Sequence, residues 1–137
     1  MILVSFSWRA YPSNLLDYIY RPTANVTLKG PVASLSSIML IDTGADISII
    51  PQVTGEYLGL KRLDGEPELK IEHKGITISY IIRNIEMTIG DYSFTSPVAW
   101  SQDNNNAMIL GRYGVFKYFA IEFREPELKT IFYLWEV

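Results

Sequence analysis

The sequence contains no cysteine and only one histidine, His73. Without cysteine the chain cannot form disulfides, thiolate nucleophiles or cysteine-ligated metal sites. A single histidine rules out a histidine-rich zinc site, and any serine–histidine mechanism would depend on that one residue.

Long apolar runs and an excess of positive charge are also absent. No run approaches the roughly 20 apolar residues that a membrane span requires. The opening residues, MILVSFSWRAYPSNLLDY, lack the basic segment that precedes the apolar core of a secretory signal. The formal net charge of -3 gives no electrostatic reason for binding nucleic acid. We expect a cytoplasmic protein with neither a membrane nor a nucleic acid as partner.

What the sequence does contain is a series of short strand-like segments. Apolar and polar residues alternate over Ile76 to Tyr80 and again over Ile85 to Ile89, as in strands with one buried face. Hairpin turns are expected at His73-Lys74-Gly75 and at Gly90-Asp91. With 137 residues the chain can bury one core. The pattern predicts an all-β domain folded as a closed or partly closed barrel.

Two short helical segments interrupt the strands. Pro51 can begin a helical turn that Gly55 or Gly59 ends. Residues 111–119 are predicted to form the main helix, in the C-terminal half, with an apolar side that includes Val115 and Phe119. No domain boundary is visible. We interpret residues 1–20 as an N-terminal extension and residues 21–137 as a single domain.

The segment IMLIDTGADISII, residues 38–50, places an acid where the pattern predicts core. Taken alone, Asp42-Thr43-Gly44 is an ordinary turn sequence. Its apolar flanks, however, put the Asp42 carboxylate at a buried loop tip, where an isolated charge is costly unless partners are supplied. Such a carboxylate is a candidate for acid–base chemistry.

The motif IDTGADISIIP, followed downstream by MILGRYGVF, resembles the pattern of the retropepsins, the retroviral-type aspartic proteases. The resemblance covers about Thr23 to Phe123 in order and spacing. It implies an acid-protease barrel and a homodimer in which each subunit contributes one Asp42. The chain has a single Asp-[Ser/Thr]-Gly triplet, which is consistent with that arrangement.

The resemblance also implies a role for each residue of the loop. Paired Asp42 side chains would share a proton and activate the water that hydrolyses an extended peptide or protein substrate, without a metal or cofactor. Thr43 would hydrogen-bond across the dimer, Gly44 would let the backbone approach the substrate, and Ala45 would keep the pocket wall small. We predict that Asp46 pairs bidentately with Arg112 beneath the loop; the alternative is that both are solvated surface charges.

By order along the chain, the flap that would cover the substrate lies at residues 72–78. Its predicted contact residues are His73, Lys74, Gly75 and Ile76, a more polar tip than the glycine-rich retroviral one. For His73 the alternative is an exposed loop histidine without a role. The polar flap slightly favours a second function, a catalytically inactive dimerisation or peptide-binding module. The terminal segment LKTIFYLWEV fits either an interleaved dimer strand or an ordinary intrachain edge strand.

Overall fold

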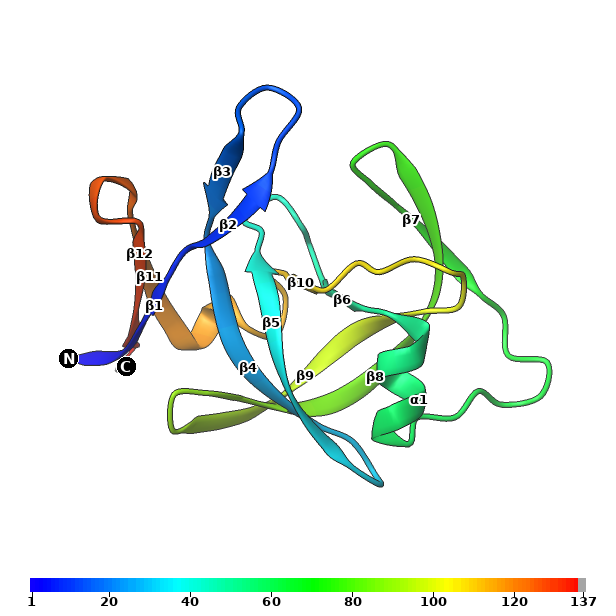
Figure 1. The fold of residues 1–137 in the computed structure, drawn as a ribbon. Coiled ribbons are helices and arrows are strands. Elements are labelled where there is room, and N and C mark those ends of the chain that lie inside the picture. The colour runs from blue at the N-terminus through cyan, green and yellow to red at the C-terminus, as the bar shows by residue number, and fades with distance from the viewer. Residues whose placement is uncertain (136–137) are drawn as a thin grey trace.

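The computed structural model describes residues 1–135, which form a mostly β structure. Figure 1 shows one α-helix, α1, beside a set of strongly curved strands. The strands are β1 (Ile2–Ser7), β2 (Arg9–Pro12), β3 (Tyr18–Arg21), β4 (Thr23–Lys29), β5 (Ser34–Ile41), β6 (Ser48–Ile50), β7 (Leu69–His73), β8 (Ile76–Ile89), β9 (Tyr92–Ser101), β10 (Ile109–Leu110), β11 (Phe119–Arg124) and β12 (Lys129–Leu134). The helical elements are α1 (Gln52–Leu58) and the 3-10 turns η1 (Phe116–Tyr118) and η2 (Glu125–Glu127).

Six of the strands close into a barrel. Their order is β4-β5-β10-β6-β9-β8, and the pairing of β8 with β4 completes the ring. Both expected hairpin turns are present. The first joins the end of β7 at His73 to β8, and the second joins the end of β8 at Ile89 to β9. Side chains such as Leu28, Ile50 and Met87 are fully buried inside, because alternate residues of each strand face inward. The predicted all-β closed barrel is confirmed.

Of the two predicted helical segments, the one after Pro51 forms an α-helix and the one over residues 111–119 does not. Helix α1 follows Pro51 and ends at Gly59, which has a φ of 93°, as the turn signals indicated. Residues 111–118, by contrast, form a series of turns that includes η1, and Phe119 begins β11, so the predicted helix over 111–119 is absent. Gly114 adopts a φ of 79° there, and this left-handed conformation interrupts the right-handed path that a helix needs. The single α-helix of residues 1–135 therefore lies in the first half of the chain.

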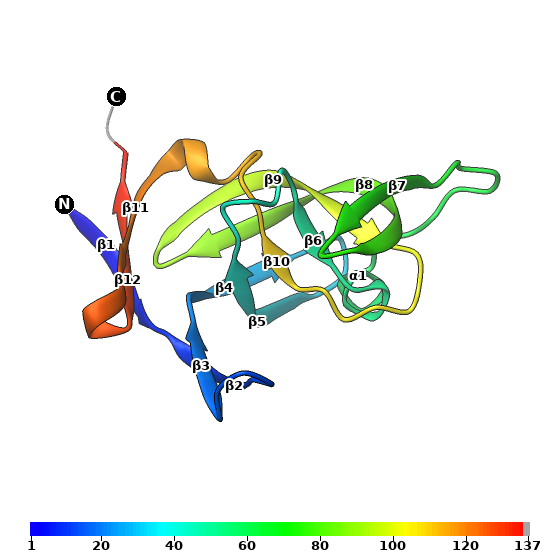
Figure 2. The ribbon, with the colours of Figure 1, turned by 90° about the horizontal axis from the view of Figure 1, so that it is seen from above.

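The two ends of the chain meet in a separate sheet, β1-β12-β11. Figures 1 and 2 both show this sheet at one end of the molecule, beside the barrel. Phe132 of β12 is fully buried, and the Trp8 Nε1–H donates to Thr130 Oγ1 at 2.8 Å. Strand β12 is hydrogen-bonded on both sides within its own chain. Of the two alternatives for the terminal segment, the structure shows the intrachain strand, but its expected place at the sheet edge was wrong, because β12 lies between β1 and β11.

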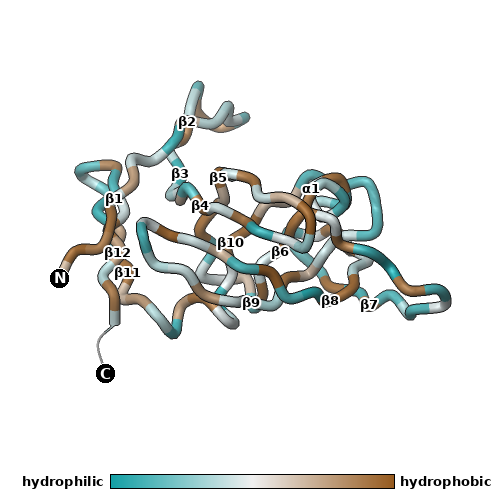
Figure 3. Tube along the Cα trace, turned by 90° about the horizontal axis from the view of Figure 1, so that it is seen from below, coloured by the Kyte–Doolittle hydropathy of each residue, from teal (hydrophilic) through white to brown (hydrophobic). Residues whose placement is uncertain are grey.

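The loop between α1 and β7, residues 59–68, extends away from the barrel and is mostly hydrophilic in Figure 3. Arg83 of β8 fixes it there. Its guanidinium donates to both carboxylate oxygens of Glu66, with an Nη1–Oε2 distance of 2.8 Å, and to the Lys61 carbonyl at 2.9 Å. The Arg83 hydrogen bonds, followed by one from the Leu63 amide, lower the pKa of Glu66 from 4.5 to about 2. Sequence reasoning did not find this pair.

Glu66→Gln should therefore lower the Tm at neutral pH but not at low pH. Because folding depresses the pKa of Glu66, its ionised form stabilises the fold above pH 4.5, and that contribution is lost as the pH falls from 4.5 towards 2. Thermal denaturation of both proteins across this range should show the Tm difference closing. Asp64→Asn, an exposed change in the same loop, is the control. A Glu66→Gln difference that stays constant with pH would contradict the assignment.

Candidate active site

Asp42 lies immediately after β5, where the strand leaves the barrel. Its backbone amide donates to the Leu110 carbonyl at 3.1 Å, and its carbonyl accepts from the Ala45 amide at 3.2 Å. The side chain also closes a local turn, because the Gly44 amide donates to Asp42 Oδ1 at 2.9 Å. The carboxylate is 21% exposed. One oxygen is thus fixed by the loop, and the other, Oδ2, faces outward from that turn.

The second predicted motif supports this loop through backbone hydrogen bonds. Strand β10 lies between β5 and β6, so the chain that follows it runs directly beside residues 45–48. The Arg112 amide donates to the Ala45 carbonyl at 3.0 Å, and the Tyr113 amide donates to the Asp46 carbonyl at 2.8 Å. The Gly111 amide donates to the buried Ser48 Oγ at 3.0 Å. The two motifs, far apart in sequence, meet as predicted.

The side chains of Asp46 and Arg112 do not make the bidentate pair that was predicted. A single contact joins Arg112 Nη1 to Asp46 Oδ1 at 3.9 Å, and the Arg112 and Asp46 side chains are 61% and 89% exposed respectively. A contact of this kind contributes little, since water screens it. The backbone hydrogen bonds already join the two segments, so both side chains are free to extend into solvent. The alternative of solvated surface charges describes them better.

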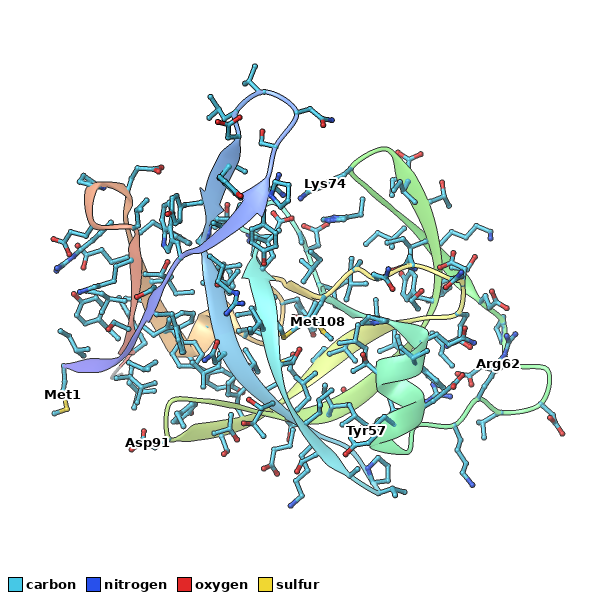
Figure 4. All side chains as sticks on the ribbon, viewed as in Figure 1. Met1, Tyr57, Arg62, Lys74, Asp91 and Met108 are labelled. Atoms are coloured by element: carbon cyan, nitrogen blue, oxygen red, sulfur yellow. The ribbon has the colours of Figure 1, made fainter. Side chains whose placement is uncertain are left out.

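The β7–β8 hairpin lies where the flap was expected, and its inner face contacts the active-site loop. Ile71 and Ile78 pack in one apolar cluster with Ala45. Lys74 and Gly75 form the tip, with φ values of 52° and 78°, and Figure 4 labels Lys74 there. These two residues and Ile76 are exposed. Three of the four predicted flap residues therefore point to solvent in this chain.

His73 is the fourth, and it faces Asp42. Its Nε2 lies 3.9 Å from Asp42 Oδ2, and its side chain is only 15% exposed. The interpretation of His73 as an exposed loop residue was wrong. Since side chains alternate along a strand, His73 shares a face with Ile71 rather than with Glu72, and this alternation was the signal that sequence reasoning overlooked.

The other side of the loop borders an open cavity of about 470 Å³. Thr43 and Ile41 line it together with residues of the N-terminal hairpin β2–β3, including Tyr20 and Arg21. Figure 1 shows this hairpin and the β7–β8 hairpin projecting from the same end of the barrel. Thr43 and Gly44 are exposed, whereas Ala45 is buried. The residues of the Asp-Thr-Gly turn are thus accessible between the two hairpins.

The site offers no obvious place for a metal. Within residues 1–135, no three histidine, aspartate or glutamate side chains gather in a way that could hold an ion. In the same part of the chain, none of the helices has the length and apolar character needed to cross a membrane. The groups that the structure brings together at this loop are the Asp42 carboxylate, the His73 imidazole and the Gly44 amide.

Comparison with known proteins agrees with this geometry. A family model described as aspartyl protease matches residues 24–113, which include the whole first motif, the MILGRY part of the second motif, strands β5 to β10 and all of β4 but its first residue. A comparison with curated proteins gives no match. The matched part covers well over half of the chain and contains Asp42, its turn and the hairpin above it. The chain therefore belongs to an aspartyl protease family of the retropepsin-like type.

Proposed function

We propose that the protein is an aspartic endopeptidase that works as a homodimer and hydrolyses peptide bonds of an extended polypeptide. The observation that carries the proposal is the placement of the two Asp42 carboxylate oxygens. Its Oδ1 is held by the Gly44 amide, while Oδ2 faces the space beneath the β7–β8 hairpin. One carboxylate is fixed in place with a free oxygen, but the chain supplies only one such group.

A second copy of the chain would supply the other carboxylate. Two Asp42 side chains that meet across a two-fold axis cannot both be ionised, because their like charges would lie too close, so they share a proton. The ionised carboxylate takes a proton from water, which attacks the scissile carbonyl carbon. The protonated one hydrogen-bonds to the carbonyl oxygen, and a proton then passes to the leaving amine. The peptide would lie between the subunits, beneath the hairpins.

Thr43 and Gly44 have supporting roles in this proposal. Thr43 is exposed beside Asp42, where its hydroxyl could hydrogen-bond to the partner's loop across the two-fold axis. At Gly44 a side-chain Cβ would lie 3.3 Å from Asp42 Oδ1, closer than most Cβ contacts, so glycine leaves the turn and the approaching peptide unobstructed. Ala45 packs under the loop with Ile49 and Ile78 and keeps it in position.

The proposal is tested by incubating the protein with a peptide library from acid to neutral pH while sedimentation reports its oligomeric state. Specific activity should fall on dilution below the dimer dissociation constant, because a monomer holds half a site. Retention of specific activity while sedimentation shows only monomers would contradict the shared site. A protein that is dimeric and binds peptides but leaves the library intact would instead be a non-catalytic peptide-binding module.

A further inference from the structure

The two oxygens of Asp42 have different partners. Oδ1 accepts a hydrogen bond from the Gly44 amide of its own turn. Oδ2 faces His73 Nε2 at 3.9 Å, and both side chains are largely shielded from solvent. His73 comes from another part of the fold, the last residue of β7, immediately before the Lys74-Gly75 tip. The one histidine of the chain therefore lies against the one oxygen that the loop leaves free.

The separation of the two groups leaves no room for an oxygen atom hydrogen-bonded to both. Two hydrogen bonds of about 2.8 Å that meet at one oxygen at about 105° place the outer atoms about 4.4 Å apart. The observed 3.9 Å is shorter than that. A carbonyl oxygen or attacking water that takes up this position beside Oδ2 would have to push His73, and with it the hairpin tip, away.

We propose that His73 is a positioning residue that holds the β7–β8 hairpin over Asp42 of its own subunit and that a peptide must displace. The contact is strongest when the imidazole is protonated and the carboxylate is ionised, because only then do opposite charges meet. The part that concerns the substrate rests on the proposed function. The contact between hairpin and loop does not.

Among the charged side chains around the hairpin, Asp42 is the one that His73 faces. Glu72 and Lys74, its neighbours in the hairpin, are exposed. Asp103, in the segment after β9, accepts hydrogen bonds from the Ser79 amide and the Ser101 hydroxyl near the other end of the hairpin, and these bonds lower its pKa. Asp46 extends into solvent beside Arg112. The contact should therefore weaken when His73 loses its proton, and again when acid protonates Asp42.

A spin label on the hairpin tip tests the contact without any substrate. The chain has no cysteine, so Lys74→Cys gives one attachment point at the tip. At one fixed pH the label should have low mobility in the otherwise unchanged protein, because the contact holds the hairpin over the loop. Adding His73→Gln or Asp42→Asn should increase the mobility of the label at that pH. Label mobility that both changes leave unaltered would overturn the proposal.

Kinetics then test displacement by the substrate. His73→Gln should lower KM by about two- to fivefold, with kcat nearly unchanged. His73→Lys, which carries a positive charge, should not lower KM. Glu72→Gln, on the outer face of the same hairpin, is the matched control. A His73→Gln protein whose KM is raised would overturn displacement and identify His73 as a substrate-binding residue.

The two measurements separate this proposal from the proposed function. If the protein cleaves no peptide but the label responds to both substitutions, the hairpin contact is supported and the protease function is contradicted. If the protein cleaves peptides but the mobility of the label does not change with either substitution, the protease function is supported and the role of His73 is contradicted.

Discussion

Asp42→Asn is expected to lower kcat/KM by about 10³-fold or more for any peptide that the wild-type protein cleaves. An amide can neither take a proton from water nor give one to a leaving amine, so the substitution removes both roles of the proposed pair. The change is nearly isosteric, and the carbonyl oxygen of the new side chain can still accept the Gly44 amide hydrogen bond that Asp42 Oδ1 accepts now. Fold and dimerisation should therefore persist, which sedimentation and thermal denaturation can verify.

Mixing subunits that carry the same substitution with wild-type subunits tests whether two subunits share one active site. Excess Asp42→Asn protein, mixed with wild type and allowed to exchange subunits, should suppress activity because each mixed dimer holds one carboxylate. Asp46→Asn protein is the control, since Asp46 is 89% exposed and makes only the long contact with Arg112. Activity that depends only on the amount of wild-type chain, despite demonstrated exchange, would mean that one Asp42 is enough.

Gly111→Ala should strongly destabilise the fold. Gly111 follows β10 directly, and a Cβ at this position would overlap the backbone carbon and oxygen of Ile47. Backbone atoms cannot rotate away as a flexible side chain can, so the strand would have to shift and strain the Gly111–Ser48 hydrogen bond. We expect a loss of about 3 kcal/mol in the free energy of unfolding, measured by urea denaturation.

Gly65→Ala separates this steric effect from the conformational cost of replacing glycine. Gly65 has a φ of 73°, but no atom lies within 4 Å of the position that a Cβ would occupy there. Its replacement should cost only about 1 kcal/mol, the penalty of the left-handed backbone. Equal losses at the two positions would show that close approach to Ile47 is not what requires glycine at 111.

The barrel could be predicted from sequence because its strands carry their own signal. Alternation over residues 85–89 reflects one buried face, whereas Ile78 is the only buried residue of 76–80, and the apolar residues around Asp42 match β6 and the buried residues Met39 and Ile41 of β5. Likewise, the two motifs indicated that Asp42 and Gly111 belong to one site. Local pattern and tertiary packing agree in these segments.

The remaining features depend on geometry that the pattern does not contain. Val115, Phe116 and Phe119 have helical spacing, yet Gly114 turns left-handed and their side chains reach the core from separate turns. The Glu66–Arg83 pair joins a loop to a strand 17 residues away, and many other polar pairings would fit the same sequence equally well. The orientation of His73 was readable from strand alternation, but its closeness to Asp42 depends on how the hairpin curves over the loop.

The pairing of β1 with β12 has a consequence for the order in which the chain folds. It joins Ile2 to Tyr133 and Phe6 to Thr130, and the Trp8 side chain just after β1 donates to Thr130, 122 residues further along, so these contacts close almost the whole chain into a loop. Such a contact loses much chain entropy and is favourable only after the intervening barrel has shortened the path. We expect the terminal sheet to form last in refolding. Until then Leu3, Val4 and Phe6 lack their packing against the core, and collisions between unfinished chains would compete with the final step.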